Sequence, residues 1–220
     1  MSAKQLNLLN SFPKTARDIE SRKLNKDINR ELALRFGYEY FDGTREQGYG
    51  GYYYDGRWEN VVKDIMSYYN LDNNSKILDI GCAKGFLIYD FKELFPQTEV
   101  WGVDISKYAI DRVDKSISNN VVIANAKELP FESNYFDLVV SINSLHNILN
   151  VNETIDALSE IQRVTKKYSF VSLGAYENNQ ERKIIDEWAV VATTYVNEKD
   201  WLKIFNKAGY EGDYWWFKPS

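Results

Sequence analysis

Residues 77–87 read ILDIGCAKGFL, and this stretch decides the fold. Residues 76–80, KILDI, predict a buried strand, and residues 85–95, GFLIYDFKELF, predict the helix that follows it. Gly81 permits a tight turn between the two elements, and Gly85 lets the helix begin close to the sheet. A ligand can therefore approach the backbone N–H groups at the positive end of that helix.

From this stretch to the C-terminus, strand and helix patterns alternate. Further strands are predicted at residues 98–105, 120–125, 135–143, 168–176 and 210–217. Helices are predicted between them, at residues 106–118, 152–165, 180–192 and 197–209. Ser106 is the expected N-cap of the first of these helices, and Gly209 ends the last. Such alternation predicts an α/β fold: a doubly wound, mostly parallel sheet of about six to seven strands with helices on both faces.

The N-terminal quarter has a different character. Between Thr15 and Phe36, apolar residues recur every four positions, which predicts one helix that Gly37 would end. Residues 36–58 hold nine aromatic residues and six glycines, a pattern typical of an irregular cover or of a mobile lid over a pocket. A helix is expected again from Trp58 to Tyr69. We therefore expect residues 1–58 to form a helical and Gly/Tyr-rich cap, within the same domain as the ligand-binding residues 59–220.

Composition excludes several classes of protein. The chain has 220 residues and is 44% hydrophobic, which suits one compact domain, and it contains no apolar run long enough to cross a membrane. The N-terminal residues do not resemble a secretory signal, and the single cysteine, Cys82, suits a reducing cytoplasm. With one histidine and one cysteine, a metal site is not expected. The net charge of −5 argues against nucleic acid as a partner.

A second motif concerns the ligand. Asp104 stands at the end of the second predicted strand, 23 residues after Gly81, where a carboxylate can accept both hydroxyls of a ribose. An isolated acid there could equally cap the next helix, but the two features together favour a nucleoside ligand. Positions 81, 83 and 86 read Gly, Ala and Phe, which departs from the Gly-x-Gly-x-x-Gly fingerprint of nicotinamide cofactor sites.

Residues 77–87, ILDIGCAKGFL, resemble the first motif of class I S-adenosylmethionine-dependent methyltransferases. Residues 100–106, VWGVDIS, resemble the ribose-binding strand of that family. Residues 125–148 resemble its adenine-binding loop and fourth strand, so that the resemblance covers residues 60–175. It implies a Rossmann-like fold, S-adenosylmethionine as cofactor and a methyltransferase of the small-molecule type.

The resemblance also implies a role for particular residues. Asp79 would hold the amino group of the cofactor, Asp104 the ribose hydroxyls, and Ile105 would lie against the adenine. The remaining cofactor-binding positions are Gly81, Cys82, Ala83 and Gly85 beside the methionine portion, Asn125 and Ala126 at the adenine edge, and Ser141 and Asn143 near the sulfonium. The sequence departs from the family twice, with Ala83 in place of a common glycine and Asn125 in place of a common aspartate.

His146, the only histidine, directly follows the fourth predicted strand. A neutral hydroxyl or a cationic amine must lose a proton on methylation, and a positioned base accelerates that loss by roughly 10²–10⁴. Relatives that methylate oxygen often have a histidine near this point, so His146 is the candidate catalytic base. The alternative is that it packs against the fold and only bonds the backbone.

The acceptor site is expected at the cap. Six of the nine arginines lie within residues 1–58, and arginine suits a bidentate grip on phosphate or carboxylate. The candidate acceptor-binding residues are Arg17, Arg45, Tyr49, Tyr52, Tyr53, Arg57 and His146. They indicate O-methylation of a small polar, anionic metabolite such as a phosphorylated, nucleotide-linked or carboxylated sugar, by a monomer or homodimer. N-methylation, and a cofactor-binding assembly protein without activity, remain open alternatives.

Overall fold

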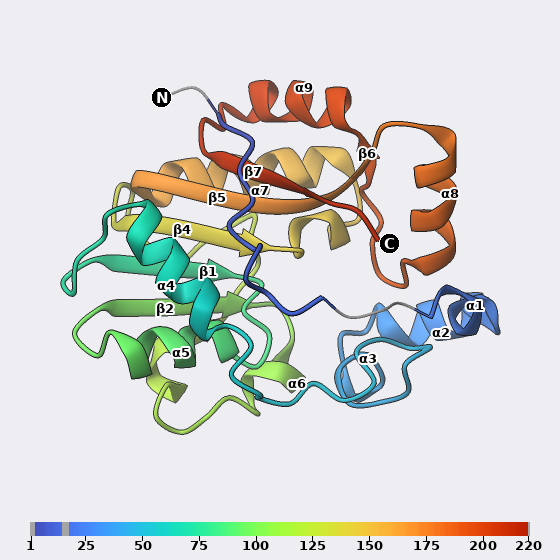
Figure 1. Ribbon diagram of the computed structural model, residues 1–220, viewed down its shortest axis with the longest axis horizontal. Coiled ribbons are helices and arrows are strands. Elements are labelled where there is room, and N and C mark those ends of the chain that lie inside the picture. Colours follow the sequence, from blue (N-terminus) through green and yellow to red (C-terminus); the bar gives the residue numbers. More distant parts are fainter. Residues whose placement is uncertain (1–2, 15–17, 220) are drawn as a thin grey trace.

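The protein is described by a computed structural model for residues 3–14 and 18–219, and within these residues seven strands form one sheet (Figure 1). The strands are β1 (Lys76–Ile80), β2 (Glu99–Asp104), β3 (Val121–Ile123), β4 (Phe136–Ile142), β5 (Thr165–Tyr176), β6 (Val196–Asn197) and β7 (Asp213–Phe217). Their order is β3-β2-β1-β4-β5-β6, and β7 also pairs with β5. All of these pairings are parallel, so the predicted fold class is confirmed.

The order of the strands locates the ligand-binding edge. From β1 the chain first builds outward to β2 and β3, and it then returns to the other side of β1 with β4 and β5. The crossovers on the two sides therefore diverge at β1 and β4, and this switch point leaves a crevice beyond the carboxyl ends of those strands.

The helices cover both faces of the sheet (Figure 1). They are α4 (Glu59–Tyr68), α5 (Phe86–Leu94), α6 (Lys107–Ile110), α7 (Val151–Val164), α8 (Asn179–Trp188) and α9 (Glu198–Ala208). Ile77 of β1 packs in one core cluster with α4 and α5, whereas the adjacent Leu78 packs in another cluster with α7 and α9. Successive residues of a buried strand thus serve two apolar layers, which is why β1 is apolar at nearly every position.

The single helix predicted for residues 15–36 is wrong. The described part of this stretch contains two short helices, α1 (Ile19–Lys23) and α2 (Lys26–Ala33), and Asn25 between them has a left-handed backbone with φ 51°. Leu24 and Ile28, which the predicted apolar stripe would bury, are exposed. Gly37 does not end this helix but precedes a third short one, α3 (Tyr38–Phe41).

These helices dock through both apolar and polar contacts, since Ala33 and Phe36 pack in a cluster with Val190 and Val191 while basic side chains bind backbone carbonyls. Arg30 donates to the carbonyl oxygens of Val190 and Ala192, at 3.0 and 3.2 Å. Lys26 likewise donates to backbone carbonyls at the end of α8. The partner segment lies 160 residues further along the chain, where no local pattern could reveal it.

Three smaller differences concern the sheet region. Ser106 caps α6 as predicted, with its Oγ accepting from Ala109 N, but the helix ends at Ile110 and not at residue 118. Asp114 then accepts from the backbone of Ser116, a local turn that competes with helix. The helix predicted for residues 180–192 ends at Trp188, and the strand β6 is not among the predicted strands.

In the part of the chain that the structure describes, no helix is long and apolar enough to cross a membrane.

Candidate functional site

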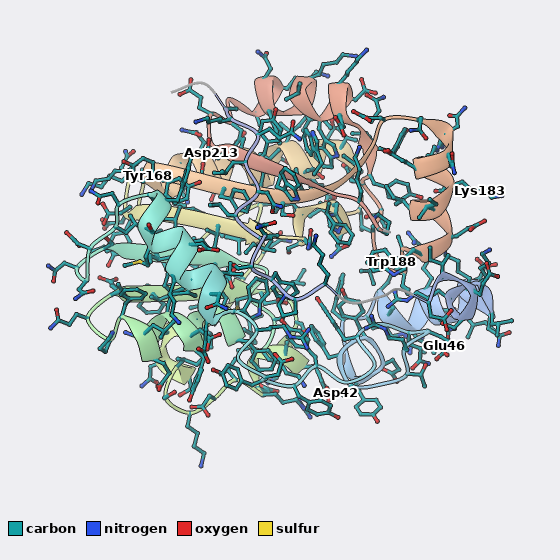
Figure 2. The ribbon with its side chains drawn as sticks, viewed as in Figure 1. Asp42, Glu46, Tyr168, Lys183, Trp188 and Asp213 are labelled. Atoms are coloured by element: carbon teal, nitrogen blue, oxygen red, sulfur yellow. The ribbon has the colours of Figure 1, made fainter. Side chains whose placement is uncertain are left out.

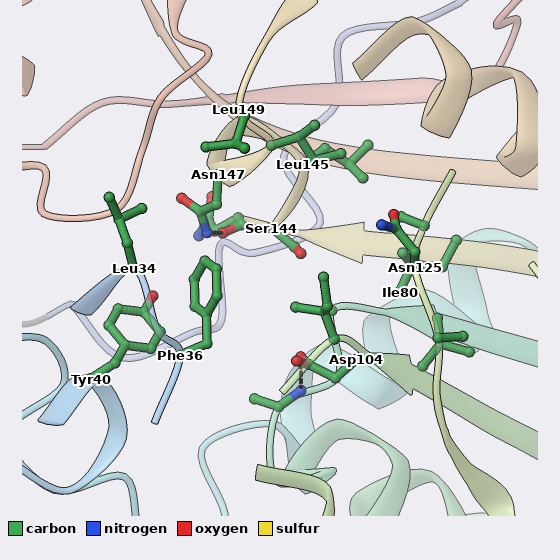
Figure 3. Close-up of a pocket in the computed structure, with 18 of the residues that line it drawn as sticks. Leu34, Phe36, Tyr40, Ile80, Asp104, Asn125, Ser144, Leu145, Asn147 and Leu149 are labelled. Carbon is green, nitrogen blue, oxygen red and sulfur yellow. Dashed lines mark hydrogen bonds between the residues drawn. The ribbon is translucent and has the colours of Figure 1, made fainter. Parts of the chain in front are cut away.

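Two adjacent cavities lie beyond the carboxyl ends of β1, β2 and β4, where the topology places the ligand site. The larger has a volume of about 560 Å³ and is shown in Figure 3, and the smaller has a volume of about 230 Å³. The residues that line both cavities are Tyr40, Tyr49, Gly81, Ala83, Ile142, Asn143 and Asn147. Because the two cavities share a wall, they can hold two reactants side by side.

The turn between β1 and α5 forms the floor of both cavities. Gly81 has φ 80°, and a Cβ there would collide with the side chain of Ser144. Ala83 also has a left-handed backbone, with φ 52°, which explains in physical terms why glycine is the unstrained residue at this position. Gly85 lines neither cavity; it starts α5 in a left-handed conformation, and a Cβ there would press on Ile117. Its role is therefore in the turn itself.

Asp79, the penultimate residue of β1, lines the smaller cavity and is only 5% exposed. Within the described residues, its carboxylate has no hydrogen-bond or ion-pair partner. Burial and, to a smaller extent, the negative charge of Asp104 raise its pKa to about 8. A buried carboxylate of this kind is stabilised by any cation that enters the cavity.

Asp104 lies at the end of β2 and lines the larger cavity. One carboxylate oxygen accepts from Ala83 N at 2.8 Å, the hydrogen bond that is dashed in Figure 3. The other oxygen accepts from Ser106 N, also at 2.8 Å. Burial raises its pKa even though these hydrogen bonds lower it. Each oxygen keeps a lone pair, so the carboxylate is oriented by the turn and can still accept two further donors.

The far end of the larger cavity is mostly apolar. Ile105 is exposed and lines it together with Ala126. Asn125 lines it as well, with its amide oxygen accepting from Lys127 N at 3.1 Å. On the opposite side, Phe36 of the cap projects toward the cavity (Figure 3). A flat ring can lie between these two walls.

Two predicted cofactor residues are placed differently from expectation. Ser141 is fully buried and lines neither cavity, because its hydroxyl donates to Ile80 O at 3.0 Å between two strands. Cys82 lines only the smaller cavity, and burial raises the pKa of its thiol well above the usual range. Asn143, by contrast, lines both cavities with a left-handed backbone, φ 54°.

The smaller cavity gathers most of the predicted acceptor residues, which are Arg45, Tyr49, Tyr52, Arg57 and His146. Arg57 pairs with Asp55 at 2.5 Å and lies over the ring of Phe12, and Arg45 donates to Tyr49 O at 2.7 Å. Tyr53, by contrast, is 69% exposed and lines neither cavity. Arg17 lies outside the described residues.

His146 follows β4 in a short 3-10 turn and is 7% exposed. Its Nδ1 accepts a hydrogen bond from Gly174 N of β5 at 3.0 Å. Burial lowers its pKa to about 4, so the ring is neutral near pH 7. The backbone contact that was one of the two alternatives is present, and the ring also lines the smaller cavity.

Sequence reasoning missed the far wall of the smaller cavity. Arg22 of α1 lines it, is buried, and donates to Gly48 O at 2.6 Å. Its guanidinium lies 5.1 Å from the ring centre of Trp188, at the end of α8 near the N-terminal helices (Figure 2). The arginine enrichment near the N-terminus was a signal, but nothing local linked Arg22 to a residue 166 positions away.

A buried ion pair joins the aromatic segment to the β1–α5 turn. Lys84 donates to both oxygens of Asp42, at 2.6 and 2.7 Å, and to Tyr52 O at 2.9 Å. Tyr108 OH and Tyr52 N donate to the same carboxylate. Burial raises the pKa of Asp42, but these hydrogen bonds outweigh it and lower the pKa overall. The cap is thereby fixed directly to the turn that lines both cavities.

Comparison with known proteins identifies a domain within the chain. A family model described as a methyltransferase domain matches residues 78–173, which run from β1 to β5 and include the glycine turn and Asp104. Residues 78–173 thus match a methyltransferase domain, and the sheet around them has the Rossmann-like α/β order of class I methyltransferases. The match supports S-adenosylmethionine as the cofactor of this domain.

Two named relatives are also methyltransferases, and the similarity extends over part of this chain and part of theirs. A tRNA (carboxymethyluridine(34)-5-O)-methyltransferase of Arabidopsis thaliana is 29% identical over 64% of this chain and 33% of its own length. A ubiquinone/menaquinone biosynthesis C-methyltransferase, UbiE, of Cupriavidus pinatubonensis is 31% identical over 60% of this chain and 61% of its own. The chain therefore spans between a third and about three fifths of the length of these relatives.

Two solved structures share the fold. The YcgJ protein of Bacillus subtilis has a TM-score of 0.54 at 18% identity, covering 67% of this chain and 66% of that chain. A chain from the Haloferax volcanii complex that contains the Trm112 methyltransferase activator has a TM-score of 0.55 at 16% identity, covering 89% and 77%. At such identities the likeness extends to the fold alone.

Proposed function

We propose that this chain transfers the methyl group of S-adenosylmethionine to an oxygen of a small anionic acceptor bound in the smaller cavity. The observation that carries the proposal is the charge of that cavity's wall. Arg22, Arg45 and Arg57 line it, and Asp79 is the one carboxylate among its described lining residues. Guanidinium groups suit phosphate and carboxylate, so a phosphorylated, nucleotide-linked or carboxylated sugar is the class of metabolite we expect.

The larger cavity fits the nucleoside of the cofactor, whose methionine portion would cross the shared wall to reach Asp79 in the smaller cavity, beside the acceptor. Asp79 is a buried carboxylate without a partner, and the α-ammonium of S-adenosylmethionine would supply the missing cation. Asp104 would accept the ribose hydroxyls with its two remaining lone pairs. Ile105 and Ala126 would contact the adenine, and Asn125 would meet its edge without a formal charge.

When bound, the cofactor would supply a methyl group on a positively charged sulfur. The residues of the chain then do one main thing, which is to align the acceptor behind that methyl. Alignment of this kind is worth on the order of 7–11 kcal/mol of the barrier. The shared wall at Gly81 and Asn143 is where the two reactants would meet, and the cap, fixed by Lys84 and Asp42, excludes water there.

The proposed role of Asp79 predicts a pH dependence. Its pKa of about 8 in the free protein means that it must lose a proton before it can pair with an ammonium. The dissociation constant of S-adenosylhomocysteine is therefore expected to rise about tenfold for each pH unit below pH 8. Calorimetric titrations between pH 6.5 and 8.5 measure this directly, and a dissociation constant that stays level across the range would contradict the role.

The proposed role of Asp104 predicts weaker cofactor binding in Asp104→Ala. Two hydrogen bonds to the ribose would be lost, which we expect to weaken binding by one to two orders of magnitude, about 1.4–2.8 kcal/mol. The matched control is Asp111→Ala, a carboxylate on the same side of the sheet that pairs with Lys107 at the surface. Equal affinities of the two variants for S-adenosylmethionine would rule out the ribose contact.

The anionic acceptor is tested with the arginines. In protein loaded with S-adenosylhomocysteine, Arg45→Met and Arg57→Met are each expected to weaken binding of glucose 6-phosphate or glucuronate by about 10- to 100-fold, since a hydrogen bond to a charged group contributes about 1.5–3 kcal/mol. Binding of uncharged glucose would not change. Arg182→Met, on an exposed arginine that lines neither cavity, is the control. If neither cavity variant loses anion affinity, the acceptor is not held by these arginines.

The relatives' names bear on which atom is methylated. The Arabidopsis relative is named as an O-methyltransferase of carboxymethyluridine in tRNA, and the Cupriavidus relative is named as a C-methyltransferase. The cationic wall favours oxygen, because a negatively charged oxygen is held by guanidinium groups, whereas a cationic amine would be repelled by them. Cofactor binding without turnover of any anionic acceptor would instead favour an assembly protein with the same fold.

A further inference from the structure

We propose that the reacting atom of the acceptor is a carboxylate oxygen, so that the product is a methyl ester and no general base takes part. The inference rests on the proposed function: it keeps the anionic acceptor and O-methylation, and it replaces the expected sugar by a carboxylic acid with an apolar body. It comes from the tautomer that the fold imposes on His146, together with the other groups that line the smaller cavity.

The hydrogen bond to β5 fixes the tautomer of His146. Gly174 N–H can only donate, so Nδ1 of the ring must carry its lone pair and Nε2 must carry the proton. The peptide of Gly174 is itself held in place, because Trp201 Nε1 donates to Gly174 O at 2.9 Å. Within the described part of the chain, Nε2 has no hydrogen-bond partner, so the ring has an N–H donor to offer to the cavity that it lines.

Use of the same ring as a base would disturb the fold. A lone pair on Nε2 requires a proton on Nδ1, which would then face Gly174 N–H, donor against donor, in a buried position. Leaving such buried groups unpaired is unfavourable, because neither recovers the hydrogen bond that it would make with water. Burial also lowers the pKa of His146 to about 4, which disfavours the imidazolium that a base becomes after it takes a proton.

The other described groups of the cavity are not bases either. Burial raises the pKa values of the Tyr40, Tyr49 and Tyr52 phenols, which therefore keep their protons. The thiol of Cys82 behaves in the same way. Asp79 remains, and in the proposed function its carboxylate pairs with the ammonium of the cofactor.

The smaller cavity thus presents hydrogen-bond donors and positive charge, together with apolar surface. Trp58 and Trp188 line it, and so do residues 189–192, which are Ala, Val, Val and Ala. An acceptor that fits this lining is an acid with an apolar body whose reacting oxygen is ionised before it binds. A carboxylate meets both conditions. A phosphate monoester, which carries two negative charges, would keep one of them after methylation, and that charge would lie against the apolar wall.

The step balances without a proton acceptor. A lone pair of the carboxylate oxygen forms the new O–CH₃ bond, and the S–CH₃ bond breaks with its electron pair remaining on sulfur. The sulfonium becomes a neutral thioether, and the carboxylate becomes a neutral ester. Methylation of a hydroxyl, or of an ammonium by way of its free amine, would instead release one proton for each methyl group transferred.

Proton stoichiometry therefore tests the proposal on the wild-type chain. Matched probes share one carbon skeleton: phenylacetate, 2-phenylethanol and 2-phenylethylamine, and indole-3-acetate with its alcohol and amine. We expect the carboxylates to bind to protein loaded with S-adenosylhomocysteine at least tenfold more tightly than their alcohols. With tritium-labelled S-adenosylmethionine, the expected product releases labelled methanol in mild alkali, with no proton released per S-adenosylhomocysteine formed.

Histidine variants add an independent readout. His146→Gln keeps an N–H donor and is expected to lose less than tenfold in kcat/KM, whereas His146→Phe loses the donor and is expected to lose 10- to 100-fold. A general base would cost roughly 10²–10⁴ in both variants. Equal large losses in both would overturn the inference.

The outcomes separate this inference from the proposed function. One proton released per turnover, an alkali-stable methyl product, or carboxylates that bind no better than their alcohols would each overturn the carboxylate assignment. Methylation of a hydroxyl on an anionic acceptor would do so while leaving the proposed function in place. Failure of S-adenosylmethionine to bind at all would remove both.

Discussion

Replacement of Asp79 by asparagine is expected to weaken S-adenosylmethionine binding by about 2–5 kcal/mol, because it removes the buried charge that pairs with the ammonium of the cofactor. Such a loss is roughly 30-fold to several thousand-fold in the dissociation constant. The variant should also lose the pH dependence of binding between pH 6.5 and 8.5, since the group that titrates is gone. Calorimetric titration of wild type and Asp79→Asn over this range measures both effects.

The same substitution is expected to stabilise the protein without cofactor. The pKa of Asp79 is raised to about 8 in the folded chain, whereas an unfolded aspartate titrates near its ordinary value. Between these two values the folded state holds a proton that the unfolded state has lost, so this carboxyl lowers stability progressively as pH rises toward 8. Thermal unfolding should therefore give a higher Tm for Asp79→Asn at pH 8 and a small difference near pH 4.

Asp90→Asn is the matched control for Asp79→Asn. Asp90 on α5 is also buried, and burial raises its pKa, but it lines neither cavity and accepts from Tyr54 OH. It should alter stability without altering cofactor affinity. A loss of affinity in Asp90→Asn as large as in Asp79→Asn would show that binding responds to general destabilisation and not to the ammonium contact.

Lys84→Met is expected to produce the largest loss of stability. It leaves the largely buried carboxylate of Asp42 without its ion-pair partner. Breaking a fully buried pair costs about 3–5 kcal/mol, so we expect a loss toward the lower end of that range. Tyr108 and Tyr52 still donate to Asp42 and limit the loss. Urea unfolding measures the effect, and cofactor affinity should fall too, because Lys84 joins the aromatic segment to the β1–α5 turn.

Lys127→Met provides the comparison for Lys84→Met. Lys127 pairs with Glu153 at 2.7 Å, but both side chains are about a third exposed. Pairs near the surface are worth only about 0–1 kcal/mol, so this variant should unfold almost like wild type. If both lysine variants unfold at the same urea concentration, the ion pair at Asp42 does not hold the cap.

The β1–α5 turn could be predicted because its geometry is local. A buried strand, an acid, a glycine turn and a helix follow one another within residues 76–95, and Asp104 follows at a spacing set by one strand–helix–strand unit. Glycine is expected at positions 81 and 85, because the backbone there is left-handed. The type of each element is therefore indicated by the residues within it, although contacts with distant residues such as Ser144 and Asp104 then hold the turn.

The cap could not be predicted in the same way. Tyr52 lines the smaller cavity while the adjacent Tyr53 is exposed, because successive side chains of an extended segment point to opposite sides. The run of three tyrosines at residues 52–54 does not indicate which side chain points into the cavity. The docking of α1 and α2 likewise depends on carbonyl groups after α8, which are distant in the sequence.

The tautomer of His146 shows a further limit of sequence reasoning. Its position after β4 indicated a residue near the transferred methyl, and the structure places it in the lining of the smaller cavity. Whether the ring takes or gives a proton depends on Gly174 N–H, 28 residues away on the neighbouring strand. Only the paired strands reveal that contact.

The central claim is that the cavities beyond β1 and β2 bind S-adenosylmethionine, and calorimetric titration of S-adenosylhomocysteine into the wild-type chain at pH 8 tests it most directly. The account predicts one site with a dissociation constant in the micromolar range, about −8 kcal/mol, and no competition from NADH. Absence of binding at millimolar ligand, or displacement by the nicotinamide cofactor, would contradict it.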